Sequence, residues 1–238
     1  MKISILTIFP ELFSDYLDSP VIRRALQKDI AKIEIVDIRD YAKGSFRHID
    51  DSPFGGGPGM VMRCQPVLDA LEDVLEKNRE SCAPEEGGTL IAALSPRGET
   101  YTQKTARRFS ELSHLILICG HYEGMDERIY SHTDMELSIG DYILTGGELA
   151  SLVIADSVIR LLPGVLKDAS TAEESFESGL LEYPQYTQPA DYKGDKVPEV
   201  LLSGNHEAIR RWRQEEALRI TRERRPDLLI NSQAEKSD

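Results

Sequence analysis

Two glycine-rich segments lie nine residues apart in this chain, and each follows a run of apolar residues. They are Cys119-Gly-His-Tyr-Glu-Gly-Met-Asp-Glu-Arg128 and Ser138-Ile-Gly-Asp-Tyr-Ile-Leu-Thr-Gly-Gly-Glu-Leu149. Glycine lets the main chain approach a ligand closely and adopt positive φ. A helix that begins near Glu148 would direct its free N–H groups toward the same place. The pair predicts a ligand cleft built from backbone, although either segment alone could be an ordinary turn.

Length and composition are those of a soluble globular protein. The chain has 238 residues, of which 40% are hydrophobic and 29% charged, which suits one large domain or a medium domain with a small appendage. No stretch is long enough to cross a bilayer, and residues 1–10 end too soon at a proline for a secretory signal. Cys64, Cys82 and Cys119 form no CxxC pair. We therefore expect a cytoplasmic protein with no membrane partner, rather than a disulfide framework or a zinc site.

The charge is unevenly distributed along the chain. A net charge of −13 argues against nonspecific nucleic-acid binding by the whole surface. Residues 205–226 nevertheless contain seven arginines and four glutamates, whereas residues 168–182 carry only acidic charges. An arginine-rich helix on an acidic protein can hold a structured RNA locally. The alternative is a solvated helix with internal Glu/Arg pairs.

Alternation of apolar runs with helical patterns predicts an α/β fold, because the crossovers between parallel strands are usually helices. The expected strands are Lys2–Phe9, Lys32–Asp37, Thr89–Leu94, Leu115–Cys119 and Met135–Ile139. The expected helices are Pro20–Gln27, Pro66–Asn78, Thr102–Leu112, Glu148–Leu162 and His206–Arg225.

The pattern divides the chain into a domain over residues 1–166, an acidic linker over 167–176 and a helical C-terminal domain over 177–238. Pro163-Gly164 should end the long helix before the linker. In the last helix, the 100° spacing places apolar residues on one side and several arginines broadly opposite. The apolar set is Ala208, Ile209, Trp212 and Ile220, and the basic set is Arg210, Arg211, Arg222 and Arg225.

Three further segments bear on a site. Asp50–Met60 contains four glycines and two prolines and predicts a shaped loop beside the site, because no GxGxxG and no GxxxxGK[ST] occurs in the chain. Leu94-Ser-Pro-Arg-Gly98 should turn after a strand and form a third wall of the cleft, since ligands bind at the carboxyl ends of parallel strands. His121 with Tyr122 is a candidate catalytic pair, although a loop histidine is more often structural. Asp126 and Glu127 should begin a short helix.

These motifs together resemble the bacterial tRNA (guanine-37-N1)-methyltransferase family over nearly the whole chain. The matching blocks, in order, are DDSPFGGGPGM, LSPRG, CGHYEGMDER, SIGDYILTGGEL, DSVIRLLPGVL, EESFESGLLEYPQYTQP and LLSGNHEAIRRWR. The resemblance implies a trefoil-knotted α/β domain of the SPOUT class, a small helical C-terminal domain, a homodimer, and S-adenosylmethionine as methyl donor. The knot is implied by the resemblance alone, because general topological rules favour an unknotted chain.

The resemblance also implies a set of adenosylmethionine-binding residues in the knot loops. They are Leu94, Ser95, Pro96, Gly120, Tyr122, Glu123, Gly124, Ser138, Ile139, Gly140, Tyr142, Leu144, Gly146 and Gly147. A pocket lined by backbone suits this ligand, because N–H and C=O groups can read the adenine edge while small residues leave room.

Three charged residues are implied to carry the chemistry. The family base is an aspartate preceded by a glutamate, and Glu173-Glu174 stands at that place here, so Glu174 would take the proton from guanine N1. Arg160 matches an arginine that holds the target guanine. Magnesium is implied as well, with Glu173 as its ligand. The substrate would be tRNA with guanosine at positions 36 and 37. Two alternatives are a knotted RNA methyltransferase with another target and a noncatalytic RNA-binding module, which would need neither Arg160 nor the acid pair.

Overall fold

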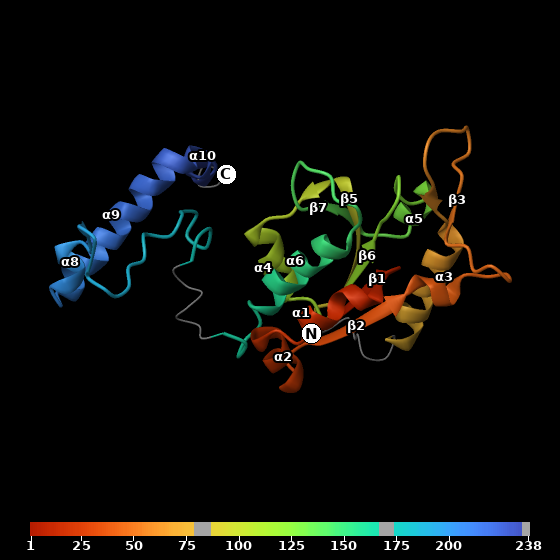
Figure 1. Ribbon diagram of the computed structural model, residues 1–238, viewed down its shortest axis with the longest axis horizontal. Helices are drawn as coiled ribbons and strands as arrows, with labels where there is room; N and C mark the ends of the chain where they lie inside the picture. The colour runs from red at the N-terminus through yellow and green to blue at the C-terminus, as the bar shows by residue number, and fades with distance from the viewer. Residues whose placement is uncertain (79–86, 167–173, 235–238) are drawn as a thin grey trace. The chain divides into compact units, whose positions relative to one another are not determined.

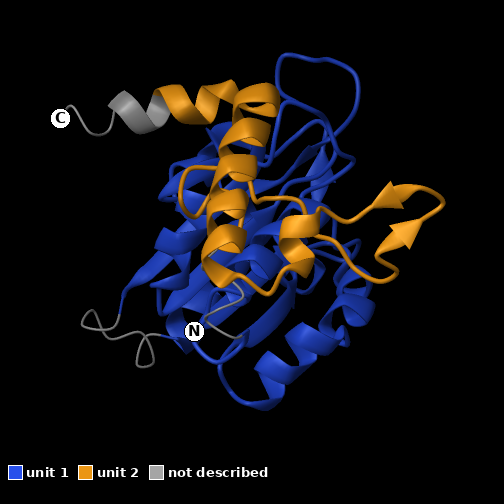
Figure 2. Ribbon diagram, turned by 90° about the vertical axis from the view of Figure 1, so that its left-hand side faces the viewer, with its two compact units in different colours: residues 1–166 blue, residues 167–238 orange. Residues whose placement is uncertain are grey.

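The computed structural model describes residues 1–78, 87–166 and 174–234 (Figure 1). The chain divides into two compact units, Met1–Leu166 and Lys167–Asp238, which Figure 2 shows in different colours. The first unit contains the sheet, and the second is mainly helical.

The first unit is built on a five-stranded parallel sheet, so the predicted α/β class is confirmed. Its strands are β1 (Lys2–Thr7), β2 (Lys32–Asp37), β5 (Thr89–Thr100), β6 (His114–Cys119) and β7 (Met135–Ser138), in the order β2-β1-β6-β5-β7. All four neighbouring pairs are parallel. Strand β6 lies in the middle, and all six of its residues are buried. A continuous apolar run of this kind is expected where both faces of a sheet are covered.

Helices cover the two faces of the sheet and produce two apolar clusters. One cluster joins Leu115 and Leu117 of β6 to one set of helices, and the other joins Ile116 and Ile118 to a second set. Alternate strand residues point to opposite faces, which explains this division. The first set comprises α1 (Ser14–Leu17), α2 (Pro20–Gln27), α4 (Gln103–Ser110) and α6 (Glu148–Ile159), and the second comprises α3 (Cys64–Lys77) and α5 (Glu127–Tyr130). Two short 3-10 helices, Pro10–Phe13 and Ile38–Tyr41, follow β1 and β2.

Strand β5 differs from the prediction that it ends at Leu94. Leu94 and Glu99 both lie opposite Leu137 of β7, and pairing then continues at Thr100 with Ser138. The four residues between them bulge out of the ladder, so the strand resumes after the expected turn. Pro96 and Gly98 are residues that normally weaken or interrupt a strand, and pairing with β7 overrides that local tendency.

The glycine-rich segment Asp50–Met60 forms most of a long hairpin. Its ends pair as β3 (Asp50–Asp51) and β4 (Val61–Met62), and the loop extends away from the sheet in Figure 1. Backbone bonds tie the second arm to the first glycine segment: Met62 N donates to Gly124 O at 2.9 Å, and Glu123 N donates to Met60 O at 3.0 Å. The hairpin therefore braces the loop after β6.

In its described residues, the second unit contains three helices and a small hairpin. They are α8 (Glu199–Leu202), α9 (His206–Arg224), α10 (Pro226–Ala234) and the strands β8 (Asp191–Tyr192) and β9 (Asp195–Lys196). The Asn205 side chain caps α9 by accepting from Glu207 N and Ala208 N.

Helix α9 has nearly the predicted bounds, but its most buried residues differ from the prediction. Ala217 and Thr221 are buried, whereas the expected apolar set is only partly covered. Thr221 is buried because its hydroxyl accepts from Leu181 N at 2.9 Å and donates to Ala217 O at 2.7 Å. In the part of the chain that the structure describes, no helix has the length and apolarity required to span a membrane.

Candidate active site

A cavity of about 310 Å³ lies at the carboxyl ends of β5, β6 and β7. All fourteen residues that the family resemblance implies for cofactor binding line it. They come from three loops: residues 94–96 after the regular part of β5, residues 120–124 after β6, and residues 138–147 after β7. Parallel strands place their carboxyl ends at one edge of a sheet, which explains why segments far apart in sequence converge here.

Six further residues line the cavity and were not assigned to it from the sequence. They are His121, Tyr130, Leu137, Ile143, Thr145 and Ala150. His121, Ile143 and Thr145 lie inside the two glycine segments. Their position in these segments would have been enough to predict that they line the cavity. Tyr130, Leu137 and Ala150 belong to α5, β7 and α6. Their place depends on tertiary packing, and no local pattern marks them.

Two adjacent glycines allow the loop after β7 to pass against the end of β6. Gly147 N donates to Gly120 O at 2.8 Å, and a Cβ on Gly147 would lie 2.8 Å from Cys119 Cα. A Cβ on Gly146 would lie 2.8 Å from His121 Nε2 and closer still to Glu148 Oε2. Real Cβ atoms do not approach backbone or packed side chains so closely. The close contact between these loops therefore requires glycine at both positions.

Helix α6 begins at Glu148, as the sequence predicts, and this residue is only 4% exposed. Thr7 Oγ1 donates to Glu148 Oε1 at 2.9 Å and joins the end of β1 to the start of the helix. A carboxylate in the first turn is favoured by the helix dipole. Burial raises the pKa of the neighbouring Cys119 thiol, and the Glu148 charge acts in the same direction. Cys119 is therefore a protonated core residue and no nucleophile.

The turn after β7 is held by its own backbone and by one serine. Gly140 N donates to Ser138 Oγ at 3.2 Å, and Ser138 Oγ donates to Gly140 O at 3.1 Å. Gly140 has a φ of +146°, and a Cβ there would lie 2.6 Å from the Tyr142 ring. The positive φ disfavours larger side chains at this position.

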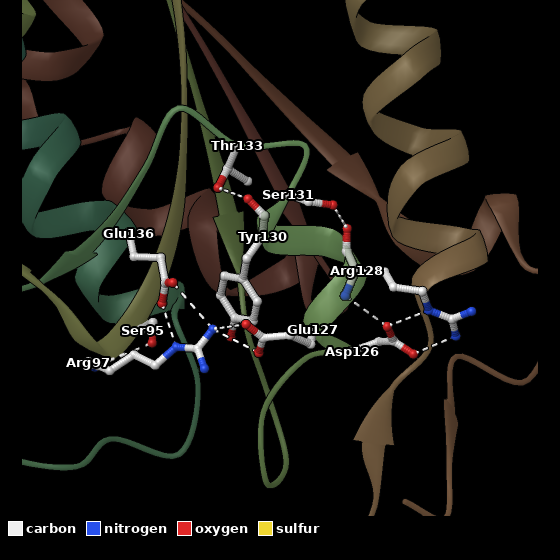
Figure 3. Close-up of polar contacts among 9 residues, drawn as sticks. All are labelled: Ser95, Arg97, Asp126, Glu127, Arg128, Tyr130, Ser131, Thr133 and Glu136. Atoms are coloured by element: carbon white, nitrogen blue, oxygen red, sulfur yellow. Dashed lines mark hydrogen bonds and ion pairs between the residues drawn. The ribbon is translucent and has the colours of Figure 1, made fainter. Parts of the chain in front are cut away.

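An ion-pair network fixes the opposite wall of the cavity (Figure 3). The Arg97 guanidinium contacts Glu136 Oε2 at 2.8 Å and Glu127 Oε2 at 2.9 Å, and its Cζ lies 4.3 Å from the centre of the Tyr130 ring. Arg97 N donates to Ser95 Oγ at 3.3 Å. The bulge of β5 is thereby bonded to β7 and α5. Because Ser95 and Tyr130 both line the cavity, the network holds two of its walls in place.

Asp126 confirms the predicted start of a short helix. Its carboxylate accepts from Arg128 N at 3.0 Å and from the Arg128 guanidinium at 2.7 Å. The hydrogen bond with Arg128 holds the pKa of Asp126 below its usual value. Asp126 therefore acts as the cap of α5, beside the cavity wall.

His121 has a mixed environment. Its ring centre lies 5.1 Å from that of Phe9 and 5.1 Å from that of Tyr122. Within the described chain, its Nδ1 atom is buried without a hydrogen-bond partner. The ring packs as a wall of the cavity, which supports the structural interpretation of His121.

Of the three residues implied to carry the chemistry, Arg160 belongs to the unit that contains the cavity. Arg160 caps the far end of α6, about 18 Å along the helix from its start at Glu148. Glu174 belongs to the second unit. Glu173 lies outside the described residues. No group of three or more histidine, cysteine, aspartate or glutamate side chains suited to a metal ion occurs among the described residues.

A second and larger cavity, of about 600 Å³, lies at the other edge of the sheet. Its lining includes Thr89 and His114, which are the first residues of β5 and β6. Ligands of open α/β sheets bind outside the carboxyl ends of the strands. The smaller cavity is at that edge and is formed by glycine loops, so we assign the site to it in spite of its size.

A parallel α/β domain with a glycine-lined cavity at its carboxyl edge defines a small-molecule-binding domain of the kind that carries a cofactor. Comparison with known proteins identifies the family. The family model described as tRNA (Guanine-1)-methyltransferase TrmD matches residues 1–231. The chain belongs to this family.

Similar proteins cover the chain almost completely. The tRNA (guanine-N(1)-)-methyltransferase of Geobacillus kaustophilus (strain HTA426) is 53% identical over 232 residues, which are 96% of this chain and 91% of that protein. The protein of the same name from Bacillus subtilis (strain 168) is 53% identical over 96% of this chain and 92% of its own length. The corresponding protein of Clostridium beijerinckii is 50% identical, with the same two coverages.

Proposed function

We propose that this protein transfers a methyl group from S-adenosylmethionine to N1 of guanosine 37 in tRNA, next to the anticodon, with a guanosine preferred at position 36. Methylation of a tRNA guanine at N1 is the activity of its family, which matches residues 1–231. The methyl donor, the nucleotide position and the residue roles are our inferences. The observation that carries the proposal is the convergence of fourteen assigned residues on one cavity.

The cavity fits adenosylmethionine in size and in chemistry. A volume of about 310 Å³ lies within the range of small-molecule sites. Six of its lining residues are glycine or alanine, so backbone N–H and C=O groups are accessible to an adenine edge. When bound, the ligand supplies an electrophilic methyl group on a sulfonium centre. The chain itself orients that group through the loops fixed by Gly146, Gly147 and the Arg97 network.

We assign proton removal to Glu174 and guanine binding to Arg160. The Glu174 carboxylate accepts the proton of guanine N1, and the N1 lone pair then bonds the methyl carbon as the carbon–sulfur bond breaks. The Arg160 guanidinium lies against guanine O6 and stabilises the negative charge that develops there on deprotonation. No step of this scheme depends on magnesium.

A homodimer reconciles these roles with the geometry. Arg160 is at the far end of α6 from the cavity of its own chain, so the guanine site needs an arginine from a second copy. Helix α6 and the loop before it expose apolar residues that such a copy would cover, namely Ile143 (78% exposed), Leu149 (59%) and Val153 (48%). Isologous contacts of this kind are usual in dimers.

The remaining features follow the family resemblance. We propose that the loops after β6 and β7 form the trefoil knot of the SPOUT class, for which the Gly147–Gly120 bond and the contact between His121 and Gly146 are the supporting features. Residues 1–166 would then bind the cofactor, residues 167–176 would be the linker, and residues 177–238 would hold tRNA. A cytoplasmic location suits an enzyme that acts on tRNA.

Substitution of the linker carboxylates tests the chemical assignment. Glu174→Gln should keep adenosylmethionine binding and most tRNA affinity but lower the single-turnover methylation rate by about 10²- to 10⁴-fold, the usual contribution of a general base. Glu174→Asp should retain much of the rate, since it restores the shorter family carboxylate. Near-normal chemistry in Glu174→Gln, with a collapse in Glu173→Gln, would move the base by one residue.

The same experiment separates the rival functions. A knotted methyltransferase with another target would transfer methyl groups to tRNA at a nucleotide other than guanosine 37. A noncatalytic binding module would bind RNA and show no transfer in any variant.

A further inference from the structure

The second unit contains a cavity of about 410 Å³ that no catalytic role uses. Three aromatic residues line it: Tyr183 and Tyr186 from the segment before the β8–β9 hairpin, and Trp212 from α9. The Tyr186 and Trp212 rings are tilted by 52° with their centres 6.3 Å apart. Tyr186 is 49% exposed, so one wall of the cavity faces solvent. Aromatic surface left open to water in this way is suited to a ligand that stacks.

The polar groups of the cavity suit an uncharged planar ligand attached to an anionic backbone. The Arg213 guanidinium lies over the Tyr183 ring, with its Cζ 4.7 Å from the ring centre. Among the residues that line this cavity in the described chain, Arg213 is the only charged one, and no carboxylate is present. Gln185, Thr187 and Gln188 add donors and acceptors that can meet the edge of a heterocycle.

We propose that this cavity is a binding site for one unstacked nucleobase of the RNA substrate, which inserts against Tyr186 and Trp212. The inference rests on the proposed function in that the RNA is taken to be tRNA. Bases that leave a stack are held on aromatic side chains and arginine planes in single-stranded recognition. An occupied cavity would fix the position of the RNA along α9, which phosphate contacts alone cannot do.

A protein segment is the competing occupant, and the lining favours RNA. A groove for an apolar peptide would be lined mainly by aliphatic residues, as in helix-in-groove recognition. Here the exposed part of the lining combines Tyr186 (49%) and Leu202 (61%) with neighbouring amides. The other large aliphatic residues, Val197, Leu201 and Ile209, are only partly exposed. The single charge, on Arg213, is positive and attracts a phosphate backbone, whereas a carboxylate would repel it.

Trp212 provides a direct probe, because it is the only tryptophan of the chain. Titration of the full-length protein with an unmodified anticodon stem-loop should quench its fluorescence, since a stacked base is in contact with the indole. Single abasic nucleotides are then placed at each loop position in turn. We expect one abasic position to abolish the quenching and to weaken binding by about 5- to 150-fold, the range for loss of one base–aromatic stack.

Variants of Tyr186 give the second readout without removing the Trp212 side chain. Tyr186→Phe should keep binding and quenching, whereas Tyr186→Leu, which retains apolar packing, should weaken binding about as much as the abasic position. Tyr192→Leu is the matched control, because Tyr192 is also exposed (60%) in this unit but does not line the cavity. Far-UV and near-UV circular dichroism of each variant reports whether the unit is folded.

The possible results test the nucleobase site separately from the proposed methyltransferase function. If Trp212 fluorescence is quenched as the protein concentration rises, with no RNA present, the cavity binds a second copy of the chain. That result would overturn the inference. Full methylation of tRNA by Tyr186→Leu, with unchanged affinity and no sensitive abasic position, would also overturn it while the methyltransferase function stands. Position-specific quenching without any methyl transfer would support the cavity and refute the proposed function.

Discussion

Gly146 and Gly120 line the same cavity, but only one of them has space for a methyl group. A Cβ on Gly120 would make ordinary contacts, the nearest at 3.4 Å from Leu94 O. A Cβ on Gly146 would collide with Glu148, which is held by Thr7, and with His121, which is packed against Phe9.

We therefore predict different results for two matched substitutions. Gly146→Ala should lower the free energy of unfolding by about 1–3 kcal/mol, the usual cost of overpacking, and should remove most adenosylmethionine binding. Gly120→Ala should leave the unfolding free energy within about 0.5 kcal/mol of the parent. Calorimetric titration and urea unfolding measure both quantities. Equal behaviour of the two variants would show that the loop is not closely packed.

His114 gives the fold a pH dependence that is separate from catalysis. It is fully buried, its Nε2 lies 2.9 Å from Ser4 Oγ, and its Nδ1 has no hydrogen-bond partner in the described chain. Burial, aided by the Lys2 charge, lowers the pKa of His114 from 6.5 to about 4. Below pH 6.5 the unfolded chain binds a proton that the folded chain does not, so stability must fall with pH until about pH 4.

The expected loss between pH 7 and pH 5 is about 2 kcal/mol of unfolding free energy from this residue. His114→Gln keeps a polar side chain but cannot titrate, so the difference in stability between the two pH values should shrink by that amount. Urea unfolding of the parent and the variant at both pH values measures it. If the parent and the variant lose the same unfolding free energy between pH 7 and pH 5, His114 is protonated at pH 5 in the folded protein as well.

At the scale of elements, α9 contains arginines in two different states. Arg219 contacts Glu216 at 2.7 Å and Glu223 at 2.8 Å, and Arg211 contacts Glu207 at 3.5 Å. Arg222 and Arg224 form no ion pair within the described part of the chain. Both interpretations of the α9 sequence therefore hold in part, because some of its arginines pair with glutamates of the same helix and others are free cations.

The unpaired arginines should supply the phosphate contacts. Arg222→Gln combined with Arg224→Gln should weaken tRNA binding and lower the slope of log affinity against log salt by about two units, one for each lost contact. Arg219→Gln is the control, because its charge is already neutralised, and it should change the slope much less. Filter binding across a salt series provides the slopes. A larger effect from Arg219 than from the pair would reverse the assignment.

Local signals in the sequence predicted regular elements well and tertiary pairings poorly. The bounds of Pro20–Gln27 and Lys32–Asp37 are those predicted, and α9 differs by one residue, because capping and turn residues mark these ends. The resumption of β5 after Gly98 was missed, since it depends on Leu137 from a strand far along the chain. Residues Asp191–Lys196 form a hairpin with strands too short to leave an alternating pattern.

The candidate site shows the same division. The glycine and serine positions of the cavity are those that the family resemblance implies, and the glycine-rich segments that carry part of that resemblance are visible in the sequence itself. Tyr130 and the Arg97 network were not, because Glu127 and Glu136 reach Arg97 only after folding. Whether the chain is knotted could not follow from local preferences at all, since they contain no information on threading.

At the scale of the molecule, the distance between Arg160 and the cavity makes a prediction about subunits. If the arginine and the cavity of one site come from different chains, Arg160→Ala and Gly146→Ala homodimers should both be inactive. Random mixing of the two chains should then restore about a quarter of the parental activity, because half of the dimers contain one intact site of two. Sedimentation of the parent protein establishes the dimer. Mixed dimers that form without any activity would place the arginine and the cavity in the same chain.

The most direct test of the account is to map the methyl group on the RNA. Unmodified tRNA transcripts that carry guanosine at positions 36 and 37 are incubated with the protein and S-adenosylmethionine, beside transcripts with adenosine at position 37. Mass spectrometry of nuclease fragments then locates the product. The account predicts one N1-methylguanosine at position 37 of the first transcript and no methylation of the second. Methylation of both transcripts at another nucleotide, or of neither, would contradict it.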